Sequence, residues 1–196
     1  MTWQPTPPIE AWAEAFSVPP ILHVSPTKPL RVLTQGQFSI PLAKFALRYP
    51  STTEVRIIGS DIILKDRRVH SHLSLEELPK EFIADVIGVA LPGDPSALLP
   101  VLKLRLAPDG IIILGVDRFA RGRLVKDAMS RIWRQVLVYR EHMPEPSLFL
   151  MASDRPFGST LRPFPPNLKR LNPRYLKSLF ELATDEARLL FGEKVA

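Results

Sequence analysis

The sequence predicts a three-layer α/β domain, in which helices cover both faces of a mainly parallel sheet of about seven strands. From residue 30 onward, short apolar segments alternate with segments of helical spacing, and this alternation favours parallel βαβ units with right-handed crossovers. Residues 85–91, apart from Asp85, and residues 110–116 are apolar, as strands are when both faces of a sheet are covered. Residues 121–134 carry apolar side chains at a period near 3.6, which predicts an amphipathic helix.

The first 29 residues differ from the rest, because they contain seven prolines and little periodic pattern. Proline lacks a backbone N–H and fixes φ, so it disfavours regular elements. We predict an extended N-terminal arm over residues 1–29, with a helical turn or two near residues 9–16, followed by one domain over residues 30–196. Trp12 and Phe16 favour an arm that packs on a surface, because free disordered segments contain few aromatic residues.

The other elements follow from local patterns. Pro41 suits an early helical position, Ser74 with Glu77 matches a capping box, and Asn172 before Pro173 is typical of a helix start. In the helix over 121–134 the predicted buried stripe is Leu124, Val125, Ala128, Met129, Ile132 and Trp133. The strands are predicted at 30–34, 54–58, 69–73, 85–91, 110–116, 136–140 and 148–152, and the helices at 39–48, 74–77, 96–106, 121–134 and 173–191.

Composition sets broad limits on function. The chain of 196 residues is 45% hydrophobic and 23% charged and contains no cysteine, which excludes disulfides, thiolate metal sites and a cysteine nucleophile. No run of 18 apolar residues occurs, so we expect no transmembrane helix. The first residues lack the basic region of a secretory signal, so we expect a cytoplasmic protein.

The positive charge is concentrated in the second half of the chain. Residues 1–102 contain 9 Lys and Arg against 10 Asp and Glu, whereas residues 103–196 contain 17 against 10. Such an excess can attract nucleic acid or anionic lipid, and it can equally form a solvated surface that keeps the protein soluble. Both interpretations stay open for the basic residues of the helix over 121–134, which are Arg121, Arg123, Lys126, Arg131 and Arg134.

Three segments together resemble the polyamine aminopropyltransferase (spermidine synthase) family. They are RVLTQGQFSI at 31–40, DVIGVALPGDP at 85–95 and LAPDGIIIL at 106–114, and Asn172-Pro173 is similar to the family's segment before its last helix. The resemblance covers residues 30–190. It implies a Rossmann-like fold of the S-adenosylmethionine-dependent methyltransferase type. The family's N-terminal β-hairpin domain is missing or reduced to the proline-rich arm.

The resemblance also implies a nucleoside site at the carboxyl ends of the strands, where three residues are candidates. Gly36 lies in the loop that would approach the nucleoside, Asp61 follows the second strand and would bind the ribose, and Asp94 would act as the catalytic base. Each has a structural alternative. Gly36 would form a turn, Asp61 would cap the next turn, and Asp94 would cap the helix that begins near Pro95.

Around these candidates the family's motifs are eroded. Gln35, Gln37 and Phe38 add bulk where the family has glycines, and Gly59 stands in place of a glutamate. The third strand, residues 69–74, lacks the family's aspartate, and the first aspartate of the catalytic loop is replaced near Ala90. The joint loss of these groups argues that this chain retains neither the usual cofactor nor the usual chemistry of the family.

Two histidines are the only other candidates for a site. His70 and His72 share one face of a predicted strand, but no third ligand is near them in the sequence. We therefore predict an exposed pair of strand histidines and no metal site.

Three functional hypotheses remain. The first is a catalytically inactive spermidine synthase-like protein without a cofactor, which serves as a structural or protein-interaction subunit in a homo-oligomer or a larger assembly. The proline-rich arm and residues 156–166 would then bind partners. The second is a divergent aminopropyltransferase or methyltransferase that uses S-adenosylmethionine or its decarboxylated form. The third is a basic nucleic-acid-binding module.

Overall fold

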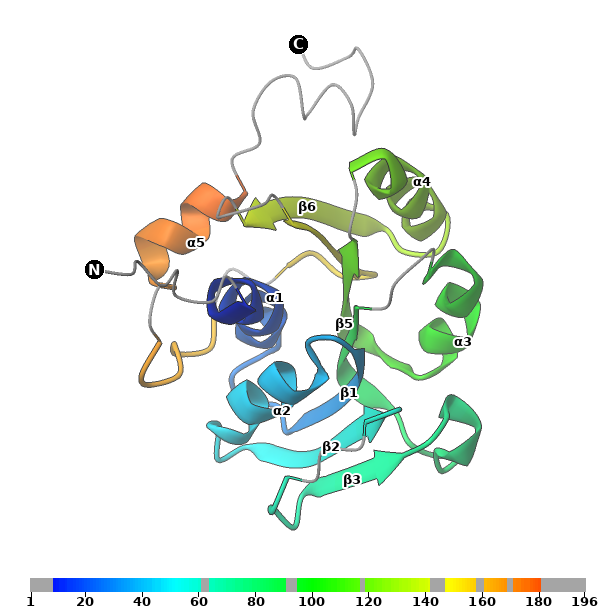
Figure 1. Ribbon diagram of the computed structural model, residues 1–196, viewed down its shortest axis with the longest axis vertical. Helices are drawn as coiled ribbons and strands as arrows, with labels where there is room; N and C mark the ends of the chain where they lie inside the picture. The colour runs from blue at the N-terminus through cyan, green and yellow to red at the C-terminus, as the bar shows by residue number, and fades with distance from the viewer. Residues whose placement is uncertain are drawn as a thin grey trace, which may run out of the picture.

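The computed structural model describes residues 9–60, 64–90, 95–116, 119–141, 147–157, 161–168 and 171–180. They form one seven-stranded sheet with the strand order β3-β2-β1-β4-β5-β7-β6 (Figure 1). Strand β7 runs opposite to the other six. The strands are β1 (Leu30–Gly36), β2 (Thr52–Ile58), β3 (Val69–His72), β4 (Ala84–Ala90), β5 (Leu106–Val116), β6 (Gln135–Glu141) and β7 (Ser147–Ser153). This topology confirms the mainly parallel α/β sandwich.

Helices cover both faces of the sheet, as Figure 1 shows. The helices α1 (Ile9–His23), α2 (Ser39–Leu47) and α5 (Pro173–Leu179) cover one face. On the other face lie η1 (Leu75–Glu77), η2 (Pro95–Leu98), α3 (Leu99–Leu104) and α4 (Phe119–Ser130). The strands β1, β4 and β5 are adjacent at the centre of the sheet. Every residue of β4 is buried, as its apolar sequence predicted.

The N-terminal segment is a helix rather than the extended arm that its prolines suggested. Helix α1 runs from Ile9 to His23 and packs against α2 and the sheet. Phe16, Ile21 and Leu22 are fully buried in the same cluster as β1 and β4 residues. Burial of this apolar segment therefore outweighs the tendency of the two prolines inside it to disrupt a helix.

A tyrosine from the far end of the chain compensates for one of those prolines. Pro19 has no N–H to donate to the carbonyl of Ala15, four residues earlier. The hydroxyl of Tyr139, in β6, donates to that carbonyl over 2.8 Å. Both residues are buried, so the bond satisfies an acceptor that water does not reach.

The apolar stripe predicted for this helix faces the core in α4, except for one residue. Val125, Met129 and Trp133 are buried, but Leu124 is 65% exposed. The helix ends at Ser130, and the N–H groups of Ile132 and Trp133 both donate to the carbonyl of Met129. Trp133 therefore lies in a turn beyond the helix, where its buried side chain anchors the chain before β6.

Two predicted helices differ in extent. Residues 96–106 form η2 followed by the short α3, and β5 begins at Leu106, earlier than predicted. Pro100, near the start of α3, lacks the N–H that a longer helix would use. Helix α5 begins as predicted, because the Asn172 side chain accepts from the N–H of Tyr175 over 2.9 Å. Its predicted continuation to residue 191 lies outside the described residues beyond 180.

The proline-rich segment at 156–166 packs on its own domain where the structure describes it. Tyr49 donates its hydroxyl to the carbonyl of Pro163 over 2.9 Å, and Arg48 donates to the carbonyl of Pro166 over 2.8 Å. Arg162 is 2% exposed. These contacts hold the described part of the segment against the protein. Among the described helices, none is long and apolar enough to span a membrane.

Candidate functional site

The carboxyl ends of β1, β2 and β4 meet at one edge of the sheet, which is the edge where open α/β sheets bind ligands. Gly36 ends β1 with φ 92°, in the left-handed region that favours glycine. The next residue, Gln37, donates its backbone N–H to the carbonyl of Ala90 over 2.8 Å. The loop after β1 is therefore fastened to the end of β4, and this N–H is occupied within the protein.

The side chains on either side of Gly36 take different positions. Phe38 is 5% exposed, and its ring centroid lies 5.0 Å from that of Phe16 and 6.2 Å from that of Phe149. It belongs to the core beneath α1 instead of filling the edge. Gln35 is half-buried and Gln37 is exposed, so these two side chains provide the bulk at the loop.

Helix α2 begins beside this loop with few free donors. Its N-cap is Phe38, and no side chain caps the first turn. A helix N-terminus binds anions through its free backbone N–H groups. Pro41 occupies the third helical position and has no N–H, which leaves those of Ser39 and Ile40.

The end of β2 offers no carboxylate among the described residues. Gly59 has φ 65°, and its N–H donates to the carbonyl of His72 in β3 over 2.8 Å. A side chain at this position would be strained, because residues other than glycine rarely adopt that conformation. The backbone here is thus suited to glycine, and not to the glutamate of the family motif. Asp61, the candidate for ribose binding, lies outside the described residues.

The end of β4 is apolar. Ala90 is 6% exposed, and the described chain resumes at Pro95, the first residue of η2. Asp94, the candidate base, lies outside the described residues. The structure therefore places Gly36 at the predicted edge, and it does not show whether either aspartate joins it.

Three buried polar atoms lie in the same region without hydrogen-bond partners among the residues that the structure describes. They are Thr34 Oγ1, Gln35 Oε1 and Ser39 Oγ. Thr34 is fully buried, and Ser39 is 2% exposed. Unpaired buried polar atoms are rare in native proteins, and Thr34 and Gln35 are adjacent in β1, so their side chains point to opposite faces of the sheet.

The two histidines of β3 lie in different surroundings. His72 Nε2 lies 2.7 Å from a guanidinium nitrogen of Arg56, and His70 is exposed. Burial lowers the pKa of His72, and the charge of Arg56 lowers it further. No group of three metal-ligating side chains occurs among the described residues.

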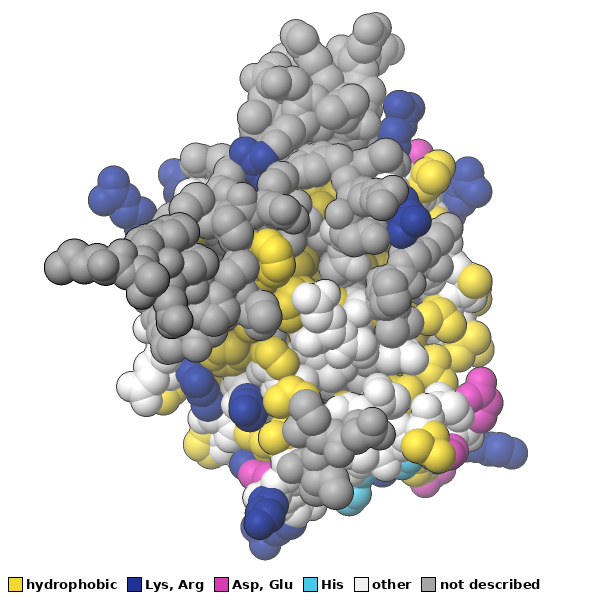
Figure 2. Space-filling view, in the orientation of Figure 1, with side chains coloured by type: hydrophobic (Ala, Val, Ile, Leu, Met, Phe, Trp, Pro, Cys, Tyr) yellow, Lys and Arg dark blue, Asp and Glu magenta, His cyan; other side chains and the backbone are white. Residues whose placement is uncertain are grey.

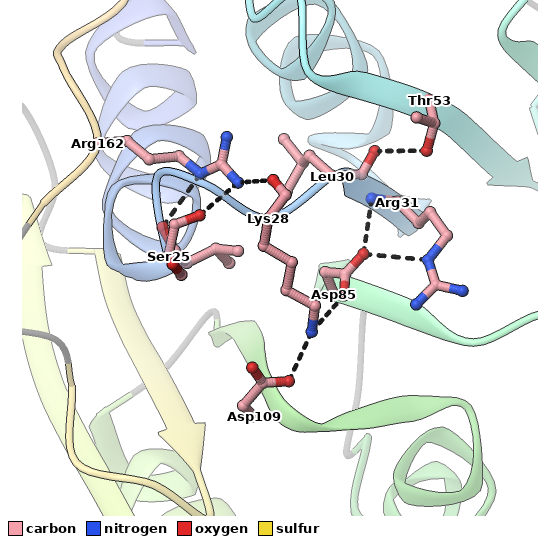
Figure 3. Close-up of polar contacts among 9 residues, drawn as sticks. Ser25, Lys28, Leu30, Arg31, Thr53, Asp85, Asp109 and Arg162 are labelled. Carbon is pink, nitrogen blue, oxygen red and sulfur yellow. Dashed lines mark hydrogen bonds and ion pairs between the residues drawn. The ribbon is translucent and has the colours of Figure 1, made fainter.

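An ionic cluster around the buried Asp85 lies at the opposite edge, at the amino ends of the strands (Figure 3). Asp85 is 1% exposed, with Oδ1 2.8 Å from Lys28 Nζ, while Oδ2 accepts from the backbone N–H and the side chain of Arg31. Lys28 also binds Asp109 over 2.6 Å. Salt bridges and hydrogen bonds from the lysine lower the pKa of Asp109.

A buried arginine, Arg162, fixes the loop that leads from α1 to Lys28 (Figure 3). Arg162 donates to the carbonyls of Val24 over 3.1 Å, of Ser25 over 2.7 Å and of Lys28. Burial lowers the pKa of its guanidinium. Sequence analysis did not identify this network, because its members come from distant segments. Through these contacts the network positions the chain between α1 and β1.

Comparisons with known proteins agree with the topology. The search against family models found no match, and no curated protein is similar in sequence. Among solved structures, the spermidine synthase from Thermotoga maritima superposes with a TM-score of 0.75 at 15% identity, over 93% of this chain and 74% of that one. A spermidine synthase in complex with the transition-state analogue AdoDATO gives a TM-score of 0.76 at 16% identity, over 93% and 75%.

Methyltransferases are more distant in structure. Human methyltransferase-like protein 13 in complex with SAH superposes with a TM-score of 0.53 at 16% identity, over 93% of this chain and 87% of that one. At identities of 15–16%, these superpositions establish the fold alone. With its strand order and its reversed strand β7, the chain has a spermidine synthase- and methyltransferase-like Rossmann fold.

Proposed function

We propose that this protein is a catalytically inactive member of the spermidine synthase-like fold that serves as a structural or protein-interaction subunit. The observation that carries the proposal is the backbone at the end of β2. Gly59 adopts φ 65° at the position where the family motif has its glutamate. The occupied N–H of Gln37 and the missing N–H of Pro41 support the same conclusion.

The described residues at the carboxyl edge do not fit S-adenosylmethionine or its decarboxylated form in the manner of the family. They supply hydroxyl and amide groups, but none of them supplies a carboxylate for the ribose. A missing buried hydrogen-bond partner costs about 1–3 kcal/mol. Two such losses would weaken nucleoside binding by roughly one to four orders of magnitude, since each 1.4 kcal/mol is about tenfold.

The face formed by α3 and α4 favours a role in protein interaction. Leu104 is 78% exposed, Leu124 is 65% exposed and Val101 is 45% exposed. In Figure 2, hydrophobic side chains gather along the side of the molecule where Figure 1 places these helices. Apolar side chains that cluster on a surface are typical of protein interfaces. We therefore infer that a partner, or a second copy of this chain, binds there.

A second candidate function is a divergent aminopropyltransferase or methyltransferase. The specific observation in its favour is the set of unpaired buried atoms near Gly36, in Thr34, Gln35 and Ser39. In this case Asp61 and Asp94 would supply the carboxylates that the described residues lack. A basic nucleic-acid-binding module is the third hypothesis, and the charge of residues 103–196 is its support.

Calorimetry distinguishes the first two candidates. The full chain is titrated with S-adenosylmethionine, its decarboxylated form and methylthioadenosine, and we expect Kd values weaker than about 1 mM. Tight binding that Asp61→Asn weakens, or methyl or aminopropyl transfer that Asp94→Asn abolishes, would establish the divergent enzyme instead.

Light scattering tests the interaction surface. If a second copy binds through α3 and α4, Leu104→Glu and Leu124→Glu lower the native mass, while Arg123→Glu, at another exposed position of α4, leaves it unchanged. A native mass that none of these changes alters excludes self-association through this face. Binding of RNA or DNA whose affinity falls steeply with salt concentration would favour the third hypothesis.

A further inference from the structure

A surface cavity of about 610 Å³ lies at the amino end of β5, away from the carboxyl edge of the sheet. The turn after α4, the turn after β7 and Pro108 of β5 surround it. Because β7 runs opposite to β5, Asp154 and Arg155, which follow its last residue, lie beside the first half of β5. The cavity is therefore separate from the site around Gly36.

Three exposed arginines line this cavity. Arg131 and Arg134 come from the turn after α4, and Arg155 comes from the turn after β7. Within the described part of the chain, none of the three guanidinium groups forms an ion pair. Asp109 is close enough to Arg155 for the arginine to lower its pKa, but its carboxylate is bound to Lys28 over 2.6 Å.

The acidic residue that lines the cavity is already neutralised. Asp154 forms a salt bridge with Lys103 of α3. The same lysine lies over the ring of Trp133, with Nζ 5.2 Å from the centroid. Among the residues that the structure describes, Asp109 and Asp154 are thus each bound to a lysine, and no carboxylate forms an ion pair with the three arginines.

Two of the arginines, Arg131 and Arg134, lie in a turn whose backbone is fixed by hydrogen bonds. Trp133 lies between Arg131 and Arg134 in the sequence and is 2% exposed. Its N–H and that of Ile132 donate to Met129 over 2.9 Å, and the N–H of Arg131 donates to Ala128 over 3.3 Å. A fixed backbone lowers the entropic cost of binding, because only the long side chains have to be ordered.

We propose that this cavity binds a small ligand that carries two or more phosphate groups. The planar guanidinium donates two parallel hydrogen bonds to a phosphate, so arginine suits this chemistry better than lysine. The volume is in the range of small-molecule sites, roughly 300–1,000 Å³, and three arginines around it provide donors for more than one phosphate. The hydroxyl of Ser130, which also lines the cavity, is a further donor.

Calorimetry with inorganic triphosphate tests the proposal at about 0.15 M salt, where weak surface attraction is screened. We expect triphosphate to bind the full chain, and orthophosphate to bind at least about tenfold more weakly. Arg131→Gln, Arg134→Gln and Arg155→Gln should each weaken triphosphate binding by roughly tenfold, as loss of a charge-assisted hydrogen bond does. Arg123→Gln, on the exposed surface of α4 and outside the cavity lining, is the matched control and should leave the affinity unchanged.

A further variant tests whether the removal of a negative charge from the cavity strengthens triphosphate binding. Asp154→Asn removes the carboxylate and releases Lys103, so we expect it to tighten triphosphate binding severalfold. Circular dichroism verifies that each variant is folded. The proposal is overturned if triphosphate does not bind, if Arg123→Gln weakens binding as much as the cavity variants, or if Asp154→Asn weakens it. RNA that binds while triphosphate does not would also overturn it, in favour of an extended nucleic-acid surface.

Discussion

Replacing Tyr139 with phenylalanine tests how helix α1 accommodates Pro19. The tyrosine hydroxyl is the described donor to the carbonyl of Ala15, at 2.8 Å, and Pro19 lacks the N–H that would otherwise donate to this carbonyl. Tyr139→Phe preserves the ring, which packs against Phe149 and Phe180. The substitution therefore removes the hydrogen bond with little change in packing.

The expected cost follows from the burial of the acceptor. Ala15 is 1% exposed, so water cannot replace the lost donor, and a buried unpaired group costs about 1–3 kcal/mol. For a chain of this size each kcal/mol shifts Tm by roughly 2–4 °C. Urea unfolding and thermal melts followed by circular dichroism measure both quantities.

A double-mutant cycle with Pro19→Ala identifies the cause. Alanine at position 19 restores an N–H that can donate to Ala15 within the helix. Tyr139→Phe should therefore cost about 1 kcal/mol less in the Pro19→Ala background than in the natural sequence. A cost below about 0.5 kcal/mol for Tyr139→Phe alone, or an equal cost in both backgrounds, would refute the argument.

Three further outcomes follow from the structure. Trp133→Ala should lower the free energy of unfolding by about 3–5 kcal/mol in urea titrations, because the ring is 2% exposed; a nearly neutral change would mean that the ring does not stabilise the core. Gly88→Ala should cost about 1–3 kcal/mol in the same assay, because a Cβ there overlaps Leu42 and lies 3.1 Å from Phe16 Cε1; unchanged stability would contradict this packing. Burial raises the pKa of Tyr49 to about 12, so above pH 10 the unfolded chain loses this proton first and stability should fall as pH rises toward 12. Tyr49→Phe should reduce that slope, and an unchanged slope would assign the alkaline loss to other groups.

The sequence predicted some features of the candidate site and not others. Gly36 lies at the carboxyl edge as expected, because a strand followed by a helix brings the intervening loop to that edge. The direction of Phe38 could not be predicted, since its burial depends on Phe16 of α1 and Phe149 of β7. The loss of the family's glutamate was visible in the sequence, whereas the left-handed conformation of Gly59 is a property of the folded backbone.

The sequence by itself determined the fold class, because the signals for it are local. The alternation of apolar strands with helical segments predicted the sheet and its layers, and Asn172 with Pro173 correctly predicted the start of α5. Such signals depend on side-chain periodicity and capping within a few residues.

Only the tertiary structure decided the features that depend on distant partners. The prolines of α1 argue against a helix locally, and the helix forms because burial and the hydroxyl of Tyr139, 124 residues away, compensate for them. Likewise, Lys28 and Asp109 are separated by 81 residues, and Arg155 joins the arginines of the turn after α4 only because β7 runs antiparallel to β5 and to β6. Contacts of this kind are set by how the chain returns on itself, and no local pattern of residue types encodes that path.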